Sequence, residues 1–232
     1  MRALMLAAGC GTRLRPLTDS VPKCLVPIHG QALLGIWLER LHQAGIGPFL
    51  VNTHYLSNQV REFMATNSHR DQVTLVHEAV LLGTAGTLVA NLDFFAGQDG
   101  LLVHADNYCL ADFRAFVQAH AQRPPGCVMT MMTFRTDTPQ TCGIVELDAR
   151  GVVVRFHEKV ANPPGNLANG AVYLLSAELL QTMAGELRTA TDFSTQVLQR
   201  LVGHIYTHET QDFFLDIGTP HAYALANAWS SA

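Results

Sequence analysis

The sequence predicts an α/β fold with a mixed, mainly parallel central sheet. In the first half, short apolar runs alternate with segments of helical periodicity, which is the pattern of strand-helix-strand units. After about residue 126, strand-like runs follow one another, which indicates a mixed or antiparallel half. The chain has 232 residues, 48% of them hydrophobic and 15% charged, enough for a large buried core. We therefore expect a single domain over residues 1–232, with halves 1–125 and 126–232.

The first half begins with a buried strand predicted at residues 3–7. A helix is expected over residues 31–44, because apolar residues recur there at helical spacing and Gly45 follows as a stop signal. Its apolar stripe consists of Leu34, Trp37, Leu38 and Leu41. Further strands are expected at residues 49–53, 73–78 and 101–105, with helices at 57–65 and 85–91.

The second half contains four strand-like runs, at residues 128–134, 143–148, 152–158 and 171–176. Ser176 is expected to cap a short helix that ends before Gly185, and Asp192 another that runs to about residue 201. Pro220 suits the first turn of a last helix. The sequence contains no hexapeptide array, so no C-terminal β-helix is expected.

Charge and cysteine content argue against several classes of protein. Lys and Arg number 15 against 19 Asp and Glu, which predicts no basic field of the kind that a nucleic-acid polymer attracts. No apolar run approaches the roughly 18 residues of a membrane span. The five cysteines are scattered and form no C-x-x-C pair, which argues against a disulfide framework and a zinc site. We expect a cytoplasmic protein with reduced thiols and no membrane partner.

A glycine-rich loop follows the first predicted strand. The glycines of Gly9-Cys10-Gly11 allow backbone N–H groups to approach a phosphate at the carboxyl end of a strand, where open α/β sheets bind ligands. The dinucleotide fingerprint fails at Leu14, and the mononucleotide loop fails because the sequence has no Gly-Lys pair. Positive charge comes from Arg13, Arg15 and Lys23. A triphosphate site and an ordinary surface turn with solvated basic residues both remain open from this loop alone.

Six motifs, in one order along the chain, extend this loop into a larger pattern. They are Gly9-Cys10-Gly11-Thr12-Arg13-Leu14 with Pro22-Lys23, then Leu82-Gly83-Thr84-Ala85-Gly86, Asp106, Glu158-Lys159, Asn169-Gly170-Ala171-Val172-Tyr173 and Asp216-Ile217-Gly218-Thr219-Pro220. The set resembles the signature of the sugar-1-phosphate nucleotidyltransferases, the nucleoside-diphosphate-sugar pyrophosphorylases. The chain is similar to short mannose-1-phosphate guanylyltransferases and N-acetylmuramate-1-phosphate uridylyltransferases, and the resemblance covers nearly its whole length.

The resemblance implies a Rossmann-like (GT-A-like) three-layer α/β/α fold and an enzyme that joins a sugar-1-phosphate to a nucleoside triphosphate, releasing pyrophosphate. It implies catalytic roles for Arg13, Lys23 and Asp106. The implied nucleotide-binding residues are Ala8, Gly9, Gly11, Thr12, Arg13, Lys23, Gly83, Thr84 and Ala85. The implied sugar-phosphate-binding residues are Glu158, Lys159, Asn169 and Gly170.

Mg²⁺ is the cofactor that the resemblance implies, with Asp106 and Asp216 as its ligands. Each aspartate follows a strand-like apolar run, so both carboxylates are expected at one edge of the sheet. Hard carboxylate oxygens suit Mg²⁺, which also bridges phosphates. Taken alone, either aspartate is more typical of a turn or a helix cap, and only the glycine-rich loop and Lys159 favour the metal site.

The resemblance also suggests which nucleotide and which sugar phosphate the enzyme uses. We expect GTP with mannose-1-phosphate or heptose-1-phosphate, and a uridylyltransferase for N-acetylmuramate-1-phosphate or glucose-1-phosphate is the alternative. The family pattern has glycine where this chain has Ala105 and commonly proline where it has Val160, departures that leave every charged group in place. A non-catalytic regulatory protein that binds sugar nucleotides is an alternative of another class, and a nicotinamide-dependent oxidoreductase is disfavoured by Leu14.

Overall fold

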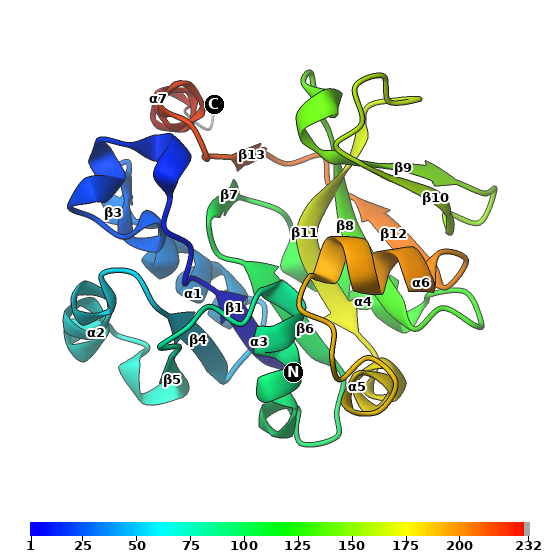
Figure 1. The fold of residues 1–232 in the computed structure, drawn as a ribbon, viewed down its shortest axis with the longest axis horizontal. Coiled ribbons are helices and arrows are strands. Elements are labelled where there is room, and N and C mark those ends of the chain that lie inside the picture. Colours follow the sequence, from blue (N-terminus) through cyan, green and yellow to red (C-terminus); the bar gives the residue numbers. More distant parts are fainter. Residues whose placement is uncertain (230–232) are drawn as a thin grey trace. The chain divides into compact units, whose positions relative to one another are not determined.

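The computed structural model describes residues 1–229, and the chain divides into two compact units, each assembled from segments far apart in the sequence (Figure 1). Unit 1 comprises Met1–Arg2, Leu82–Leu102 and Asp112–Gln211. Unit 2 comprises Ala3–Leu81, Val103–Ala111 and the stretch from Asp212 onward. That residues 1–232 act as a single domain stays a prediction.

Unit 2 is built on three parallel strands joined by helices. The strands are β1 (Arg2–Leu6), β4 (Phe49–Thr53) and β5 (Val73–His77), and the helices are α1 (Leu33–Gln43) and α2 (Ser57–Thr66). Strand β4 pairs in parallel with both of the others, and all five of its residues are buried. This burial is typical of a parallel strand that is covered on both faces. The strands and helices predicted here are confirmed.

Helix α1 buries the apolar stripe that its sequence predicts. Leu34, Trp37, Leu38 and Leu41 are all fully buried. The chain turns at Gly45, whose φ of +77° lies in the left-handed region that glycine adopts without strain. The helix therefore ends where the sequence predicts.

Two short antiparallel ribbons and a last helix complete unit 2. The ribbons pair β2 (Pro27–Ile28) with β3 (Gln31–Ala32), and β7 (Asn107–Cys109) with β13 (Phe214–Asp216). Helix α7 (Pro220–Ala228) starts at the predicted proline, and the Thr219 hydroxyl accepts a hydrogen bond from the amide of Ala222 at 3.2 Å. Short 3₁₀ helices lie at Thr12–Leu14, Leu17–Asp19, Lys23–Leu25 and Arg70–Gln72.

Unit 1 contains the mixed half that the sequence predicts. Its strands are β8 (Met129–Arg135), β9 (Gly143–Leu147), β10 (Val153–Glu158), β11 (Leu167–Leu175) and β12 (Ile205–Glu209), together with most of β6 (Gly100–His104). Strand β8 pairs antiparallel with β11 and parallel with β12, and β9 pairs antiparallel with β10. The four predicted strands of this half are confirmed, and β12 is an addition to them.

Unit 1 contains α3 (Thr84–Ala90), α4 (Phe113–Ala121), α5 (Ala177–Ala184) and a π-helix at Phe193–Leu198 that continues as α6 (Gln199–Leu201); 3₁₀ turns lie at Leu92–Phe95 and Pro139–Thr141. Two of these helical segments, α5 and the π-helix, start at the caps that the sequence predicts. Ser176 accepts a hydrogen bond from the amide of Leu179 at 3.1 Å, and Asp192 from that of Thr195 at 2.7 Å. Helix α4 was not predicted. Its buried face includes His120, and a search for apolar residues at helical spacing does not include a histidine.

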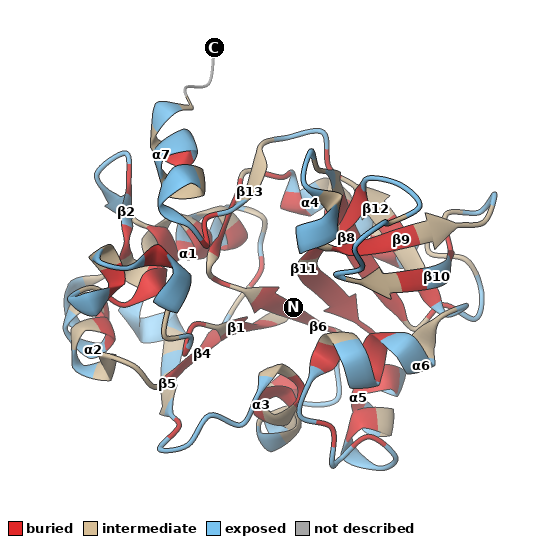
Figure 2. Ribbon diagram, turned by 45° about the horizontal axis from the view of Figure 1, so that its top comes forward, coloured by how far each residue is buried: buried red, intermediate tan, exposed pale blue. Residues whose placement is uncertain are grey.

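Buried residues concentrate along the strands and on one face of the helices (Figure 2). The five cysteines form no disulfide in the structure. Within residues 1–229, none of the helices combines the length and apolar character that crossing a membrane requires.

Candidate active site

The glycine-rich loop folds against itself at Gly11. The φ of Gly11 is +62°, and a Cβ atom there would lie 2.8 Å from Cγ2 of Thr18 and 3.2 Å from Cβ of Lys23. The Thr18 hydroxyl donates a hydrogen bond to the Gly11 carbonyl at 2.7 Å. Only glycine combines this conformation with this close approach, so Gly11 determines the path of the chain toward Lys23. Gly9, in contrast, has open space around it.

The start of the loop is held by a buried asparagine that the sequence analysis did not single out. Asn52, at 3% exposure on β4, accepts a hydrogen bond from the amide of Ala7 at 2.7 Å. Its side-chain amide donates to the carboxylate of Glu78 at 2.9 Å. The signal in the sequence is a polar residue inside an otherwise apolar strand, because such a residue needs buried partners.

The β7–β13 ribbon brings together two aspartates that are about 110 positions apart in the sequence. Its register places Asp216 opposite Asn107, the residue after Asp106. The indole N–H of the buried Trp37 donates to the carbonyl of Asn107 at 2.8 Å, which ties the ribbon to α1. The prediction that both carboxylates lie close together therefore has a specific structural basis, an antiparallel pairing between distant segments.

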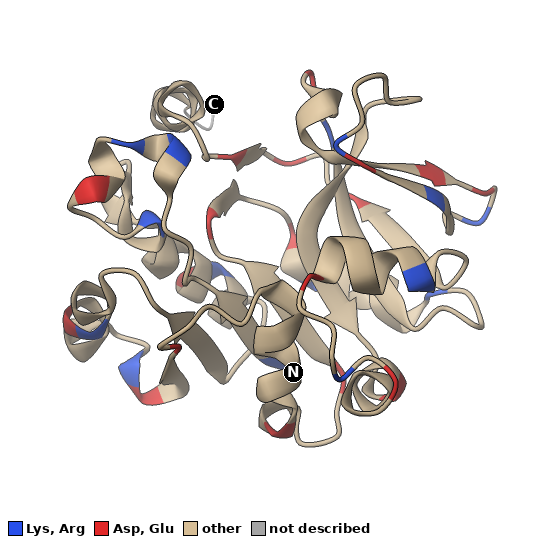
Figure 3. Cartoon of the chain, in the orientation of Figure 1, with Lys and Arg blue, Asp and Glu red and all other residues tan. Residues whose placement is uncertain are grey.

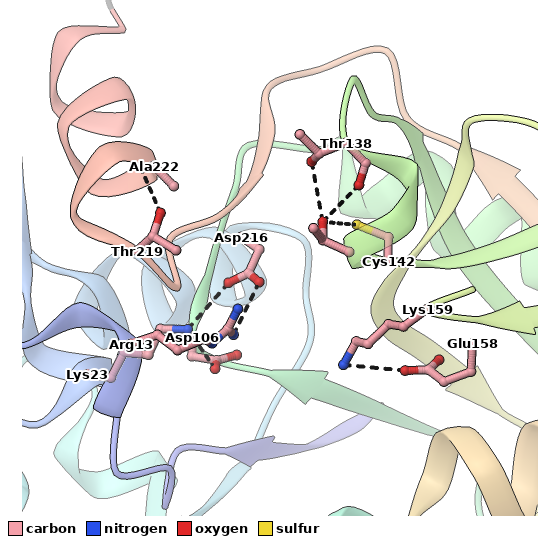
Figure 4. Close-up of polar contacts among 11 residues, drawn as sticks. Arg13, Lys23, Asp106, Thr138, Cys142, Glu158, Lys159, Asp216, Thr219 and Ala222 are labelled. Carbon is pink, nitrogen blue, oxygen red and sulfur yellow. Dashed lines mark hydrogen bonds and ion pairs between the residues drawn. The ribbon is translucent and has the colours of Figure 1, made fainter. Parts of the chain in front are cut away.

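Four charged side chains of unit 2 form a chain of ion pairs (Figure 4). The Lys23 Nζ atom lies 2.8 Å from Oδ2 of Asp106 and 3.4 Å from Oδ1 of Asp216. The second oxygen of Asp216 lies 3.6 Å from Nη2 of Arg13. We call Arg13, Asp216, Lys23 and Asp106 the charge cluster. Elsewhere, Lys and Arg residues are spread over many elements of both units (Figure 3).

Exposure differs sharply within the charge cluster. The Lys23 side chain is 5% exposed, whereas those of Asp106, Asp216 and Arg13 are 39%, 47% and 66% exposed. The ammonium group therefore lies at the buried end of the cluster and the guanidinium group at its open end. Of the two cations, Arg13 is therefore the more accessible to an anion from solvent.

The electrostatics of the charge cluster keep its deepest carboxylate ionised. Burial raises the pKa of Asp106, but the positive charges of Lys23 and His104 and the hydrogen bond from Lys23 lower it further, so the net pKa falls below its usual value. Burial also raises the pKa of the neighbouring Cys24 thiol to about 12, and the charge of Asp106 adds to this effect. Cys24 is therefore a neutral thiol at physiological pH and not a thiolate nucleophile.

Gly218 lies where a side chain would disturb the cluster. A Cβ atom there would lie 2.7 Å from Nη2 of Arg13 and 2.9 Å from Oδ1 of Asp216. The missing side chain leaves room for the guanidinium group beside the aspartate. Gly218 belongs to one of the six motifs, and its role becomes apparent only from the position of the distant Arg13.

The donor set of the cluster suits a magnesium ion. In the described part of the chain, no three His, Cys, Asp or Glu side chains are arranged to hold a metal ion. Mg²⁺ is commonly bound by one or two carboxylates together with substrate phosphates and water, whereas structural zinc sites need four protein ligands. Asp106 and Asp216, which already approach one cation from two sides, fit the first pattern.

The predicted sugar-phosphate residues lie in unit 1. The Lys159 Nζ atom lies 3.4 Å from the carboxylate of Glu158, and the Lys159 side chain is 65% exposed (Figure 4). The Asn169 amide donates to the hydroxyl of Tyr173 at 2.7 Å, and its oxygen accepts from the amide of Ala171 at 2.9 Å. Gly170 lies between them, where the register of β11 shifts. The Asn169 side chain is thus held inside its own strand.

The predicted base-binding segment also lies in unit 1, at the start of α3. A Cβ atom on Gly83 would lie 2.3 Å from the carbonyl oxygen of Thr191, and the amide of Ala85 donates to that oxygen at 3.0 Å. The hydroxyl of Thr84 accepts a hydrogen bond from the amide of Phe193 at 2.8 Å. These contacts fasten α3 to residues 191–193, and recognition of a base by this segment stays a prediction.

Comparisons with known proteins agree with the sequence motifs and the fold. The family model described as Nucleotidyl transferase matches residues 2–230. Mannose-1-phosphate guanylyltransferase catalytic subunit beta from Xenopus tropicalis is 30% identical over 227 residues, which cover 95% of this chain and 62% of that protein. The protein of the same name from Dictyostelium discoideum is 27% identical, with 95% and 62% covered. The chain therefore spans less than two thirds of the length of these curated relatives.

A solved structure is similar over almost the whole chain. HddC from Yersinia pseudotuberculosis, determined in complex with GMP-PN, superposes with a TM-score of 0.81 at 22% identity, and 98% of each chain is covered. At this identity the likeness concerns the fold. It confirms the predicted α/β class with a mixed central sheet and helices.

Proposed function

Because the chain belongs to the nucleotidyl transferase family, we propose that it joins a sugar-1-phosphate to a nucleoside triphosphate. A phosphate oxygen of the sugar phosphate forms a bond to the α-phosphorus, and the bond from that phosphorus to the leaving pyrophosphate breaks. The observation that carries this proposal is the charge cluster of Arg13, Lys23, Asp106 and Asp216. Phosphoryl chemistry needs positioning and charge neutralisation from a protein far more than covalent help, so such a cluster is suited to it.

We assign the triphosphate to the loop of unit 2. The exposed guanidinium of Arg13 meets the phosphates first, and the ammonium of Lys23 binds them from the buried side. The remaining loop residues, Ala8, Gly9, Gly11 and Thr12, are assigned to contact the triphosphate through their backbone. In unit 1, Gly83, Thr84 and Ala85 are assigned to the nucleoside.

Asp106 and Asp216 are assigned to hold Mg²⁺, which supplies charge neutralisation to the phosphate oxygens when it is bound. The approach of both carboxylates to the same ammonium group of Lys23 supports this role. The sugar phosphate is assigned to unit 1. Lys159 provides the positive charge, and Glu158, Asn169 and Gly170 contact the sugar.

GTP and mannose-1-phosphate are the substrates that we favour. The support comes from relatives at 27–30% identity, which are named mannose-1-phosphate guanylyltransferases. Heptose-1-phosphate is the next candidate for the sugar. The alternative is a uridylyltransferase for N-acetylmuramate-1-phosphate or glucose-1-phosphate, in which UTP takes the place of GTP.

A substrate panel tests this function. Pyrophosphate release is measured with GTP, UTP, CTP and dTTP, each against mannose-, heptose-, glucose- and N-acetylmuramate-1-phosphate, with Mg²⁺ and with EDTA. We expect release with GTP and mannose-1-phosphate in Mg²⁺, and at least about a hundredfold loss in Asp106→Ala, because one of the two carboxylates assigned to the metal ion is removed. The exposed Asp71→Ala serves as the matched control and keeps full activity. Background release with every pair would overturn the proposed reaction.

A further inference from the structure

Lys23 is the deeply buried member of the charge cluster. It contacts one oxygen of each aspartate, and its side chain is 5% exposed. Burying an ammonium group costs several kcal/mol unless opposite charges and hydrogen bonds surround it. The carboxylates of Asp106 and Asp216 therefore neutralise Lys23.

The carboxylate oxygens that contact Lys23 belong to the two residues assigned to the metal ion. An ammonium ion and a divalent ion repel each other at contact distance, so the Lys23 ammonium lowers the affinity of these two carboxylates for a divalent ion. The cluster holds two positive and two negative groups and is neutral as it stands. A divalent ion alone would leave it with excess positive charge, whereas a triphosphate brings the negative charge that restores the balance.

We propose that Lys23 is a resident counter-ion of the metal site and must turn from the aspartates to an anion before a divalent ion can bind. This inference rests on the proposed function, because the anion is the triphosphate of the nucleotide. It makes Lys23 the residue that orders binding, with nucleotide entering before or together with the metal. It also predicts that Lys23 weakens the metal affinity of the nucleotide-free protein.

The test is Mn²⁺ binding without nucleotide, read from the EPR signal of free Mn²⁺ and by calorimetry. Lys23→Met keeps an unbranched side chain of similar length and removes the charge. We expect Lys23→Met to bind Mn²⁺ at least about tenfold more tightly than the wild type, since the competing cation is gone. Unchanged or weaker binding in a folded Lys23→Met variant would overturn the proposal.

Two further variants show whether the gain arises at these oxygens. Arg13→Met removes an exposed cation that is 3.6 Å from one oxygen of Asp216, so we expect less than about a threefold gain. Asp216→Asn in the Lys23→Met background removes one of the two ligands and is expected to abolish the gain. A gain that survives in the double variant would place the Mn²⁺ elsewhere and contradict the proposal.

The wild-type protein provides an independent measurement should Lys23→Met not fold. The proposal requires that GTP binds in EDTA and that Mn²⁺ binds only weakly without nucleotide. Micromolar Mn²⁺ affinity in the nucleotide-free wild type would refute it. Neither metal titration requires catalysis, so a failed substrate panel would refute the proposed reaction and leave these results standing. If the wild type turns over its substrates but Lys23→Met binds Mn²⁺ no more tightly than the wild type, only the role of Lys23 is refuted.

Discussion

Gly218 illustrates how one missing side chain shapes the charge cluster. In Gly218→Ala the new Cβ would lie 2.7 Å from the guanidinium of Arg13 and 2.9 Å from Oδ1 of Asp216, and the guanidinium is the far end of the longer, more flexible side chain. We expect the guanidinium to move away, so the melting temperature changes little. If Arg13 binds the triphosphate, kcat/KM should fall by about tenfold, since a displaced charge loses part of its stabilisation of the transition state. Pyrophosphate release and thermal unfolding measure the two effects.

Gly165→Ala is the control for this substitution. A Cβ at Gly165 would meet no atom within 4 Å, so neither activity nor stability should change. Wild-type kcat/KM in Gly218→Ala would show that the guanidinium does not depend on this gap. A large loss of stability in Gly218→Ala would instead point to a structural role for the glycine.

Asp112 caps the start of helix α4, and removing this cap measures how much it stabilises the protein. One carboxylate oxygen of Asp112 accepts hydrogen bonds from the amides of Arg114 at 2.9 Å and Ala115 at 3.1 Å. Asp112→Ala leaves these amides without their cap and should lower the free energy of unfolding by about 0.5–2 kcal/mol. Urea denaturation measures this loss. Asp112→Asn keeps a capping oxygen and should lose much less, so equal losses in both variants would contradict the capping role.

The elements that the sequence predicts are those with a long local pattern. Helix α1 shows its apolar stripe and its closing glycine, and β4 begins with a run of apolar residues. Strands β7 and β13 have three residues each, too few for any periodicity, and each exists because the other lies beside it. The segment capped by Asp192 is helical as predicted, but it begins as a π-helix, a difference in hydrogen bonding that no pattern of side chains indicates.

The stability of the molecule as a whole should depend on the pH through His120. Burial, helped by the charge of Arg123, lowers the pKa of His120 to about 4, although Asp99 at 3.4 Å acts in the opposite direction. Its ring also lies 2.8 Å from the hydroxyl of Thr130. Because the pKa is lower in the folded than in the unfolded state, the unfolded chain binds a proton first as the pH falls below about 6.5. Stability is therefore lost between about pH 6.5 and 4.

The variant His120→Gln isolates this effect in the free energy of unfolding. Between about pH 6.5 and 4, the free energy of unfolding of His120→Gln should change less steeply with pH than that of the wild type. The difference in slope should reach up to about 1.4 kcal/mol per pH unit. The exposed His221→Gln serves as the control and should retain the wild-type slope. Parallel curves for His120→Gln and the wild type would show that the buried ring does not control acid stability.

The longer strands and helices, apart from α4 and β12, could be predicted from the sequence together with the family motifs and the charged residues of the candidate site, because periodicity and motif spacing are local properties. How these residues meet could not be predicted in this way. The β7–β13 register brings Asp106 beside Asp216, Lys23 lies between their carboxylates, and Gly218 leaves space for Arg13. Such contacts join residues up to about 200 positions apart, and they depend on the path of the whole chain and on which charges burial forces together.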